Sequence, residues 1–377
     1  MWKGYKVIDS DAHHHEPAYL WERYVAPEYR DRVPKVVGMR RNFFVYAAED
    51  EGLVATDGNN VAPPEHHDKW MADKYGDAYD AWWSPEIRLR DMDRYGWDTQ
   101  VILSTNANRV MDFAIRQPDV GLAMARAYHD WCRDYNSADP KRLKFTATLP
   151  AGDTPSMVEE ARRAVEDLGA VSVRNPLLPP DKWLHEPEYQ PLFQLASDLD
   201  FPISLHGEYR HRRAAPFRHM GEAEGPFRAI DHIMGFPMDN MTSLAHYIFG
   251  GILERFPKLR LGVLEANVGW AMFFLPRMDD HSHGRRRILG HELPMKPSEY
   301  VRRQCVLSAD PDEPGLDLVM DFVGDDSFVW NTDYPHPDAP DPEQVLPWFD
   351  AQPISSERKQ KVLWDNAVRL YGPRLLS

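Results

Sequence analysis

Short apolar segments recur along the chain, and each of them ends in polar residues. Eight of these segments have the length and composition of β-strands, and they cover residues 6–13, 99–106, 143–150, 170–176, 201–208, 259–265, 305–310 and 328–333. Between many of them, apolar residues recur at the spacing of amphipathic helices, over residues 85–95, 110–136, 155–168, 187–199, 241–256 and 356–371. The pattern therefore predicts strands that alternate with helices.

Eight strand–helix repeats predict a (β/α)8 TIM-like barrel of the α/β class. No G-x-G-x-x-G sequence follows the first strand, so the fingerprint of an open dinucleotide-binding sheet is missing. Two connections, about 14–98 after strand 1 and about 208–240 after strand 5, are too long for ordinary loops. We expect one metal-dependent barrel domain over 1–377, with these insertions forming a lid or an interface.

Composition narrows the class of protein. The chain has 43% hydrophobic residues and 12 Trp, enough for a large buried core. Its net charge of −15 argues against nucleic acid and against an anionic membrane surface as partners. Two cysteines in 377 residues favour a reducing compartment, and the N-terminal residues lack the apolar core of a signal peptide. Composition favours a cytoplasmic enzyme or binding protein.

Four polar side chains stand at the carboxyl ends of predicted strands. Asp11 and His13 end the first strand, His206 the fifth and Asp333 the eighth. Alternation along a strand places Asp11 and His13 on the same face. Two acids and two histidines that converge from three strands suit Zn²⁺, Mn²⁺ or Fe²⁺, with positions left for water or substrate. Any one of them alone is more often a loop residue or a helix cap, so the prediction rests on their joint placement.

Longer motifs extend from residue 8 to residue 372, and they read IDSDAHHHEP, LRDMDRYGWDTQVIL, SLHGE, GGILERFPKLRLGVLEANVGW, NTDYPHPD and VLWDNAVRLYG. By these motifs the chain resembles the amidohydrolase-related family that includes aminocarboxymuconate semialdehyde decarboxylase and the resorcylate-type decarboxylases, which are metal-dependent barrel enzymes. The resemblance implies that Asp11, His13, His206 and Asp333 bind one or two divalent ions, and that Asp333 serves as base toward metal-bound water. It also implies a homodimer or a larger homo-oligomer.

Glu265 departs from that family's pattern, which places a histidine at the end of the sixth strand. A carboxylate at this position can act as a general acid or base, or can bind metal. The leading hypothesis is therefore a metal-dependent hydrolase of an amide, ester or thioester, with Asp333 and Glu265 in proton transfer. The alternative for Glu265 is a structural ion pair with Arg174 or Arg277.

Three other functions remain open from the sequence. The chain can be a non-oxidative decarboxylase of an aromatic or muconate-like acid, a hydratase, or an inactive barrel that binds a ligand. For the enzymes, we expect the substrate to be a small organic acid or acyl compound. Arginines in the second insertion, at 210, 212 and 213, suit recognition of a carboxylate or phosphate group.

Weaker candidates flank the predicted ligands. Glu16 either binds the metal or orients His13, and His336 either binds substrate or caps its loop. His14 and His15 have poorer claims, because neighbouring residues of an extended chain point to opposite faces.

Overall fold

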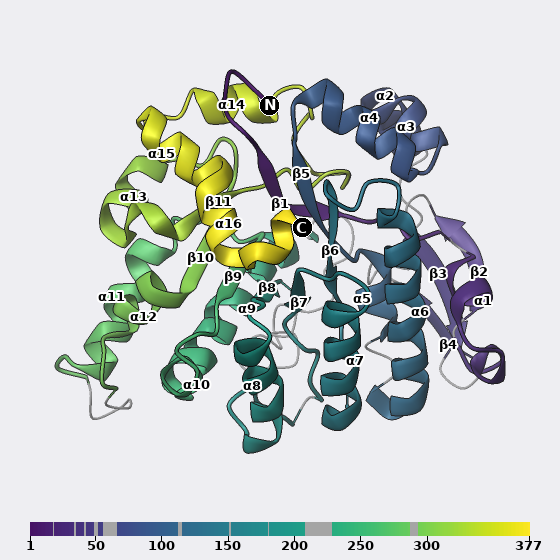
Figure 1. The fold of residues 1–377 in the computed structure, drawn as a ribbon, viewed down its shortest axis with the longest axis horizontal. Coiled ribbons are helices and arrows are strands. Elements are labelled where there is room, and N and C mark those ends of the chain that lie inside the picture. The colour runs from purple at the N-terminus through teal and green to yellow at the C-terminus, as the bar shows by residue number, and fades with distance from the viewer. Residues whose placement is uncertain are drawn as a thin grey trace.

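The computed structural model describes residues 1–17, 19–33, 35–40, 43–48, 52–55, 66–111, 115–150, 152–179, 181–207, 228–286 and 293–377. Within these ranges, eight parallel strands form a nearly closed barrel in the order β1-β5-β6-β7-β8-β9-β10-β11 (Figure 1). They are β1 (Ile8–His13), β5 (Thr99–Leu103), β6 (Leu143–Ala147), β7 (Ser172–Arg174), β8 (Ile203–His206), β9 (Leu261–Leu264), β10 (Cys305–Ala309) and β11 (Phe328–Trp330). All eight predicted strands are confirmed, each somewhat shorter than its predicted range.

Helices surround the strands, as the TIM-like prediction requires. In chain order they are α1 (Leu20–Tyr24), α2 (His66–Tyr75), α3 (Asp77–Asp80), α4 (Pro85–Tyr95), α5 (Asn106–Met111), α6 (Pro118–Asn136), α7 (Thr154–Glu166), α8 (Gln190–Asp198), α9 (Arg228–Phe249), α10 (Ile252–Arg255), α11 (Ala271–Ser282), α12 (Pro297–Gln304), α13 (Leu316–Val323), α14 (Val345–Asp350), α15 (Ser356–Gln360) and α16 (Asn366–Tyr371). None of the helices in the described ranges is long and apolar enough to cross a bilayer.

Three predicted helices differ from the structure. The helix expected over 110–136 is divided into α5 and α6, and α6 has Pro118 in its first turn, where a proline starts a helix readily. The helix expected from 241 begins at Arg228 and continues through Pro237. The helix expected over 356–371 contains a π-helical turn, Lys361–Asp365, between α15 and α16.

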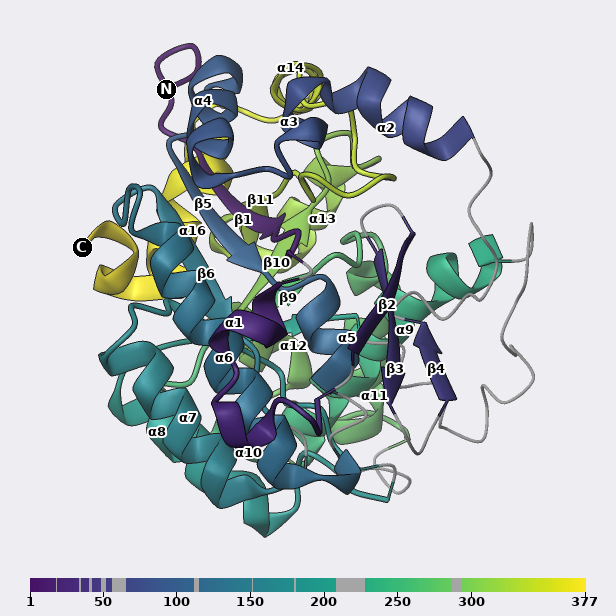
Figure 2. The same cartoon turned by 90° about the vertical axis from the view of Figure 1, so that its right-hand side faces the viewer.

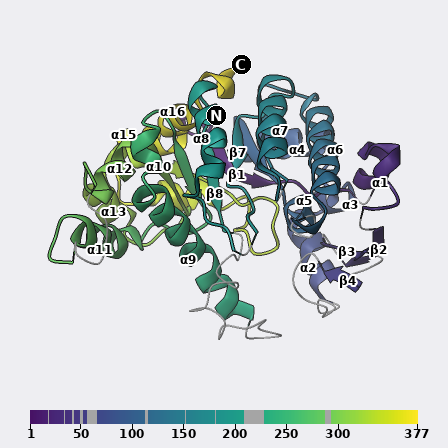
Figure 3. The same cartoon turned by 90° about the horizontal axis from the view of Figure 1, so that it is seen from below.

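The first insertion contains a small sheet that the sequence pattern did not predict. The strands β2 (Lys35–Arg40), β3 (Phe43–Ala48) and β4 (Gly52–Ala55) pair antiparallel in that order. Figure 2 shows this sheet beside the barrel. In the second insertion, 208–227 lies outside the described residues, and with it the arginines at 210, 212 and 213. Figure 3 shows that the N-terminal end of α9, which follows, projects away from the barrel, while the rest of the helix packs against β8 and α10.

Apolar side chains fill both faces of the strands. One cluster packs the strands against the surrounding helices, with Phe145, Leu205 and Trp330 among its members. A second cluster on the opposite face includes Ile8 and Val306 together with residues of the C-terminal segment such as Leu370. Burial on both faces is typical of parallel strands in α/β proteins. It leaves the carboxyl ends of the strands as the place where polar groups gather.

Hydrogen bonds join the first strand to the residues that directly follow the last strand. The main-chain N–H of His13 donates to the carbonyl of Tyr334 (2.7 Å), and that of Asp333 donates to the carbonyl of Asp11 (2.9 Å). The buried Asp9 carboxylate accepts a hydrogen bond from the Thr332 hydroxyl (2.6 Å). These hydrogen bonds close the barrel between β1 and the end of β11. They lie next to the residues that were predicted to bind metal.

Candidate active site

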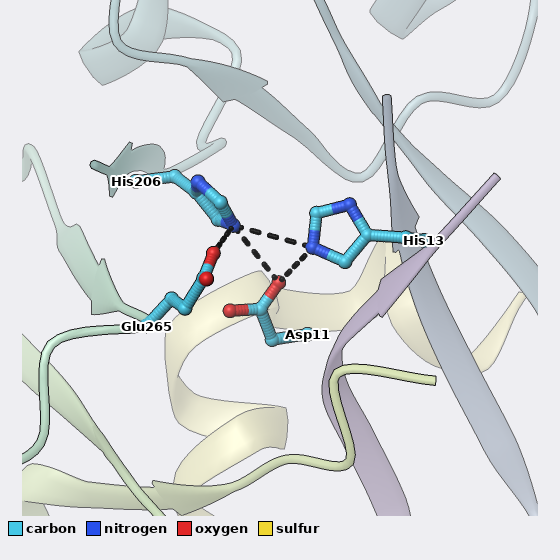
Figure 4. A group of neighbouring side chains, drawn as sticks. All are labelled: Asp11, His13, His206 and Glu265. Atoms are coloured by element: carbon cyan, nitrogen blue, oxygen red, sulfur yellow. Dashed lines mark hydrogen bonds and ion pairs between the residues drawn. The ribbon is translucent and has the colours of Figure 1, made fainter. Parts of the chain in front are cut away.

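Four predicted site residues come together at one end of the barrel. Asp11 and His13 lie on β1, His206 is the last residue of β8, and Glu265 directly follows β9. Figure 4 shows that their side chains point toward one another. Single ligand atoms of these four residues all lie within 4.8 Å of one another. Asp11 and His13 lie together as predicted, since Nε2 of His13 lies 3.3 Å from Oδ1 of Asp11, while the pairing of β1 with β5 shifts register between Asp9 and Ala12.

The histidine nitrogens stand at the centre of this cluster. Nε2 of His13 and Nε2 of His206 are 3.2 Å apart. Nε2 of His206 lies 3.6 Å from Oδ1 of Asp11 and 2.6 Å from Oε2 of Glu265. Two imidazole nitrogens and two carboxylate oxygens thus face one small space, which is the donor set that Zn²⁺, Mn²⁺ and Fe²⁺ accept.

A second group shares His13 with the first. Oδ1 of Asp333 lies 3.3 Å from Nε2 of His13 and 2.7 Å from Nδ1 of His336. The rings of His13 and His336 are stacked, with their centroids 3.9 Å apart. Asp333, predicted from its strand-end position, and His336, a candidate from the loop that follows, therefore lie directly beside the four-residue cluster.

The backbone takes a strained form at both carboxylates that follow strands. Glu265 has φ of 46° and Asp333 has φ of 54°, which residues other than glycine seldom adopt. The turn after Glu265 is held by Glu313, which accepts a hydrogen bond from the N–H of Val268 (3.2 Å). Such strain persists only where neighbouring contacts enforce it, and it concentrates at functional sites.

Burial perturbs the titration of the cluster. The pKa of Asp11 is raised to about 8, mainly by loss of water; His206 opposes the shift, and the charges of Glu265 and Asp9 add to it. Burial also raises the pKa of Asp333 well above its usual range, with Glu265 adding to the shift. The same loss of water holds the pKa of His13 well below its usual value. His13 is therefore neutral, the form in which an imidazole binds a metal ion.

Buried carboxylate oxygens of the cluster are the strongest indication that it binds a cation. Both oxygens of Asp11 are buried with no hydrogen-bond donor, and Oδ1 of Asp333 is buried against His13 and His336. A buried charge is costly unless it is paired, and a bound divalent ion reverses the pKa shifts that burial imposes. The unsatisfied oxygens and the neutral histidine together fit a divalent metal ion.

One contact has to change when such an ion binds at His206. A guanidinium nitrogen of Arg174 lies 3.0 Å from Nδ1 of His206. Because a guanidinium can only donate, this contact places the imidazole proton on Nε2, facing Glu265. A metal-bound imidazole instead donates from its other nitrogen. Binding at Nε2 therefore entails a rearrangement of the Arg174 contact.

Glu16 is placed away from the cluster. Its buried carboxylate accepts hydrogen bonds from the main-chain N–H groups of Thr105 (3.0 Å), Asn106 (2.9 Å) and Ala107 (3.2 Å). It therefore caps the start of α5, and we leave it out of the ligand set proposed below.

The two neighbouring histidines are also buried outside the cluster. Nδ1 of His14 lies 3.1 Å from the hydroxyl oxygen of Tyr128, and the His15 ring stacks on Trp83 at 4.5 Å. This placement agrees with the expectation that only His13 of the three shares a face with Asp11.

Some residues around the site carried no sequence signal. Thr105 contacts His336, and Arg88 of α4 donates to the main-chain carbonyl of His13 (2.6 Å). These contacts join segments that are more than 70 residues apart. Asp9 was the most accessible to prediction, because it stands two positions before Asp11 on the same strand.

Comparisons with known proteins match nearly the whole chain. The amidohydrolase family profile matches residues 10–372. A 2-amino-3-carboxymuconate-6-semialdehyde decarboxylase from Dictyostelium discoideum is 25% identical over 291 residues, which cover 77% of each chain. A gamma-resorcylate decarboxylase from Rhizobium sp. (strain MTP-10005) is 24% identical over 310 residues, which cover 76% of this chain and 86% of the relative.

A solved structure supports the same fold. A variant of 5-carboxyvanillate decarboxylase from Novosphingobium aromaticivorans DSM 12444 superimposes with a TM-score of 0.72 over 98% of each chain, at 18% identity. That structure contains manganese and 3-methoxy-4-hydroxy-5-nitrobenzoic acid.

Proposed function

The chain belongs to the amidohydrolase family, and on this premise we propose that it is a metal-dependent non-oxidative decarboxylase of an aromatic or muconate-like carboxylic acid. The observation that carries the proposal is the cluster of Asp11, His13, His206 and Glu265 at the carboxyl ends of three barrel strands. Active sites of TIM barrels lie at this end of the strands.

We assign the metal ion to Asp11, His13 and His206, with Glu265 and Asp333 as the flanking carboxylates. A bound Zn²⁺, Fe²⁺ or Mn²⁺ supplies a positive charge for the carboxylate of the substrate and for the electron density left when CO₂ departs. Either one or two ions are compatible with two ligand groups that share His13. Manganese in the carboxyvanillate decarboxylase structure supports a divalent ion and leaves its identity open.

The carbon that loses CO₂ must gain a proton. The carboxyl groups of Asp333 and Glu265 lie at the cluster and are the candidate proton donors. Asp333 contacts His13, and Glu265 contacts His206, so each acid is held against a different histidine. We propose these two residues for proton transfer, because each carboxyl group contacts a histidine of the cluster and burial raises the pKa of Asp333.

Decarboxylation is preferred to the hydrolysis expected from the sequence, because both curated relatives are decarboxylases and align with about three quarters of this chain. Hydrolysis stays the second candidate, and Glu265 is the observation in its favour. A carboxylate that lies 2.6 Å from a ligand histidine is suited to accept a proton from water. A homodimer or larger assembly and a cytoplasmic location stay predictions.

Product analysis separates the two reactions. The Mn²⁺-loaded protein would be incubated in D₂O with γ-resorcylate and other aromatic acids that carry ¹³C in the carboxyl group. We expect labelled CO₂ and one deuterium at the vacated carbon, and we expect chelator treatment to stop both until Mn²⁺ is restored. Uptake of ¹⁸O from labelled water into the product of an ester or amide, with no CO₂ from any acid, would establish hydrolysis instead.

A further inference from the structure

His336 is held on several sides although it lies beside the four-residue cluster and not within it. Its Nδ1 lies 2.7 Å from Oδ1 of Asp333, and its Nε2 is hydrogen-bonded to the hydroxyl of Thr105 (3.0 Å). Its ring lies flat against His13, with centroids 3.9 Å apart. The His336 imidazole therefore contacts Thr105, His13 and Asp333, and it links Thr105 to the other two residues.

Thr105 is itself fixed in place by Glu16. Thr105 is buried, and its main-chain N–H donates to Oε1 of Glu16 (3.0 Å). The same carboxylate binds the next two N–H groups and so sets the orientation of the turn that presents the Thr105 hydroxyl. Burial raises the pKa of Glu16, while these backbone hydrogen bonds oppose the shift. Glu16 was a candidate metal ligand from the sequence. In the structure it instead positions Thr105, which is hydrogen-bonded to His336.

The first insertion holds the loop that carries His336. The buried Tyr75, at the end of α2, donates its hydroxyl hydrogen bond to the main-chain carbonyl of His336 (2.7 Å). Lys74 donates to the carbonyls of Pro337 (3.2 Å) and Ala339. The main-chain N–H of His336 donates to the carbonyl of Asp333 (2.9 Å). Backbone and ring of His336 are therefore both restrained, by contacts from separate parts of the chain.

We propose that Glu16, Thr105 and Tyr75 are positioning residues that act through His336, whose imidazole keeps His13 and Asp333 in the arrangement that binds the metal ion. The inference rests on the proposed function, because it assumes that the cluster holds a divalent cation. Groups that orient metal ligands from the outside usually account for about 10–100-fold in metal affinity. Removing the Thr105 hydroxyl alone should have an effect of this size, because it removes the hydrogen bond to Nε2 of His336.

The test is to titrate the metal-free protein with MnCl₂ and to measure the affinity for Mn²⁺ by isothermal calorimetry. Thr105→Val keeps the shape of the side chain and removes the hydroxyl, and we expect about 10–100-fold weaker Mn²⁺ binding. Thr105→Ser keeps the hydroxyl and should restore most of the affinity. Thr146→Val is the matched control, since Thr146 is a buried threonine on β6 whose hydroxyl is bonded to Ser172. Its Mn²⁺ affinity should equal that of the wild type.

The outcomes separate this inference from the proposed function. If the wild type and Thr105→Val bind Mn²⁺ equally well, or if Thr105→Ser is as weak as Thr105→Val, the positioning role is wrong while the metal site stands. If the wild type binds neither Mn²⁺ nor Zn²⁺ nor Fe²⁺ in the same titration, the proposed function fails with it. Glu16→Gln provides a second variant with an intact Thr105 side chain, and we expect it to weaken Mn²⁺ binding also, because the turn at Thr105 loses a charged acceptor.

Discussion

Replacing Asp11 with asparagine is expected to remove the bound metal ion and to lower turnover by more than about 100-fold, because even outer partners of metal ligands account for about 10–100-fold. Asp11 has two buried oxygens without a hydrogen-bond donor, and Oδ1 faces the nitrogens of His13 and His206 at 3.3 Å and 3.6 Å. Asparagine has the same shape but carries no charge. The measurements are metal content by elemental analysis and turnover of the Mn²⁺-loaded protein.

Stability distinguishes loss of metal from loss of fold in this variant. In the metal-free chain, burial raises the pKa of Asp11 to about 8, so the folded state holds a proton that the unfolded state has already lost above pH 4. Stability of the metal-free protein is therefore lost as the pH rises from about 4 toward 8. Asparagine has no such titration, so the metal-free variant should be at least as stable as the metal-free wild type at pH 7.

A matched aspartate provides the control for Asp11→Asn. Asp153 caps α7 by accepting a hydrogen bond from the N–H of Ser156 (2.9 Å), and asparagine is an equally good cap. Asp153→Asn should leave metal content and turnover unchanged. An Asp11→Asn protein that keeps one equivalent of metal and full turnover would show that Asp11 is not a ligand.

Replacing Arg88 with methionine should cost about 3 kcal/mol of folding free energy or more, because buried acceptors of a charged donor would be left unpaired. Arg88 is fully buried in α4, and its guanidinium donates to the carbonyl of His13 (2.6 Å), to Oε1 of Gln100 (3.1 Å) and to the hydroxyl of Tyr135 (2.9 Å). Methionine fills much of the same space and offers no donor. Urea unfolding of the purified variant measures the change.

Arg90 lies on the same helix and supplies the comparison. It pairs with Asp77 and Asp91 and is 43% exposed, so Arg90→Met should cost less than about 1 kcal/mol. Equal stability of the Arg88 and Arg90 variants would show that the buried hydrogen bonds of Arg88 do not stabilise the fold. The larger loss expected at Arg88 reflects its contact with the end of β1, next to the cluster.

Much of the fold followed from local sequence patterns. The eight strands were predictable because each combines an apolar run with a polar end, and parallel strands that are buried on both faces leave this signature. The strands β2 to β4 were not predicted, since they lie within a long insertion that was read as a lid. The apolar spacing over 110–136 did not predict the break between α5 and α6, although Pro118 marks the start of the second helix.

The candidate site was predictable to the extent that strand ends converge. Asp11, His13, His206, Glu265 and Asp333 meet because barrel strands bring their carboxyl ends to one place, and the loop after β11 adds His336. Glu16 could not be assigned from its position, because its partners are main-chain N–H groups of residues 105–107. Arg88 likewise acts through a main-chain carbonyl 75 residues away. Contacts of a side chain with a distant backbone leave no pattern in the sequence.

The most direct test of the central claim is a crystal structure of the protein, purified without chelator, with anomalous data collected at the Mn, Fe and Zn absorption edges. We predict an anomalous peak within bonding distance of Asp11, His13 and His206, about 2.0–2.2 Å from each ligand atom. The same peak heights identify the metal, and the map shows whether Glu265 is bound and whether a second ion is present. A well-ordered cluster without an anomalous peak, in protein that turns over its substrate, would contradict a metal-dependent mechanism.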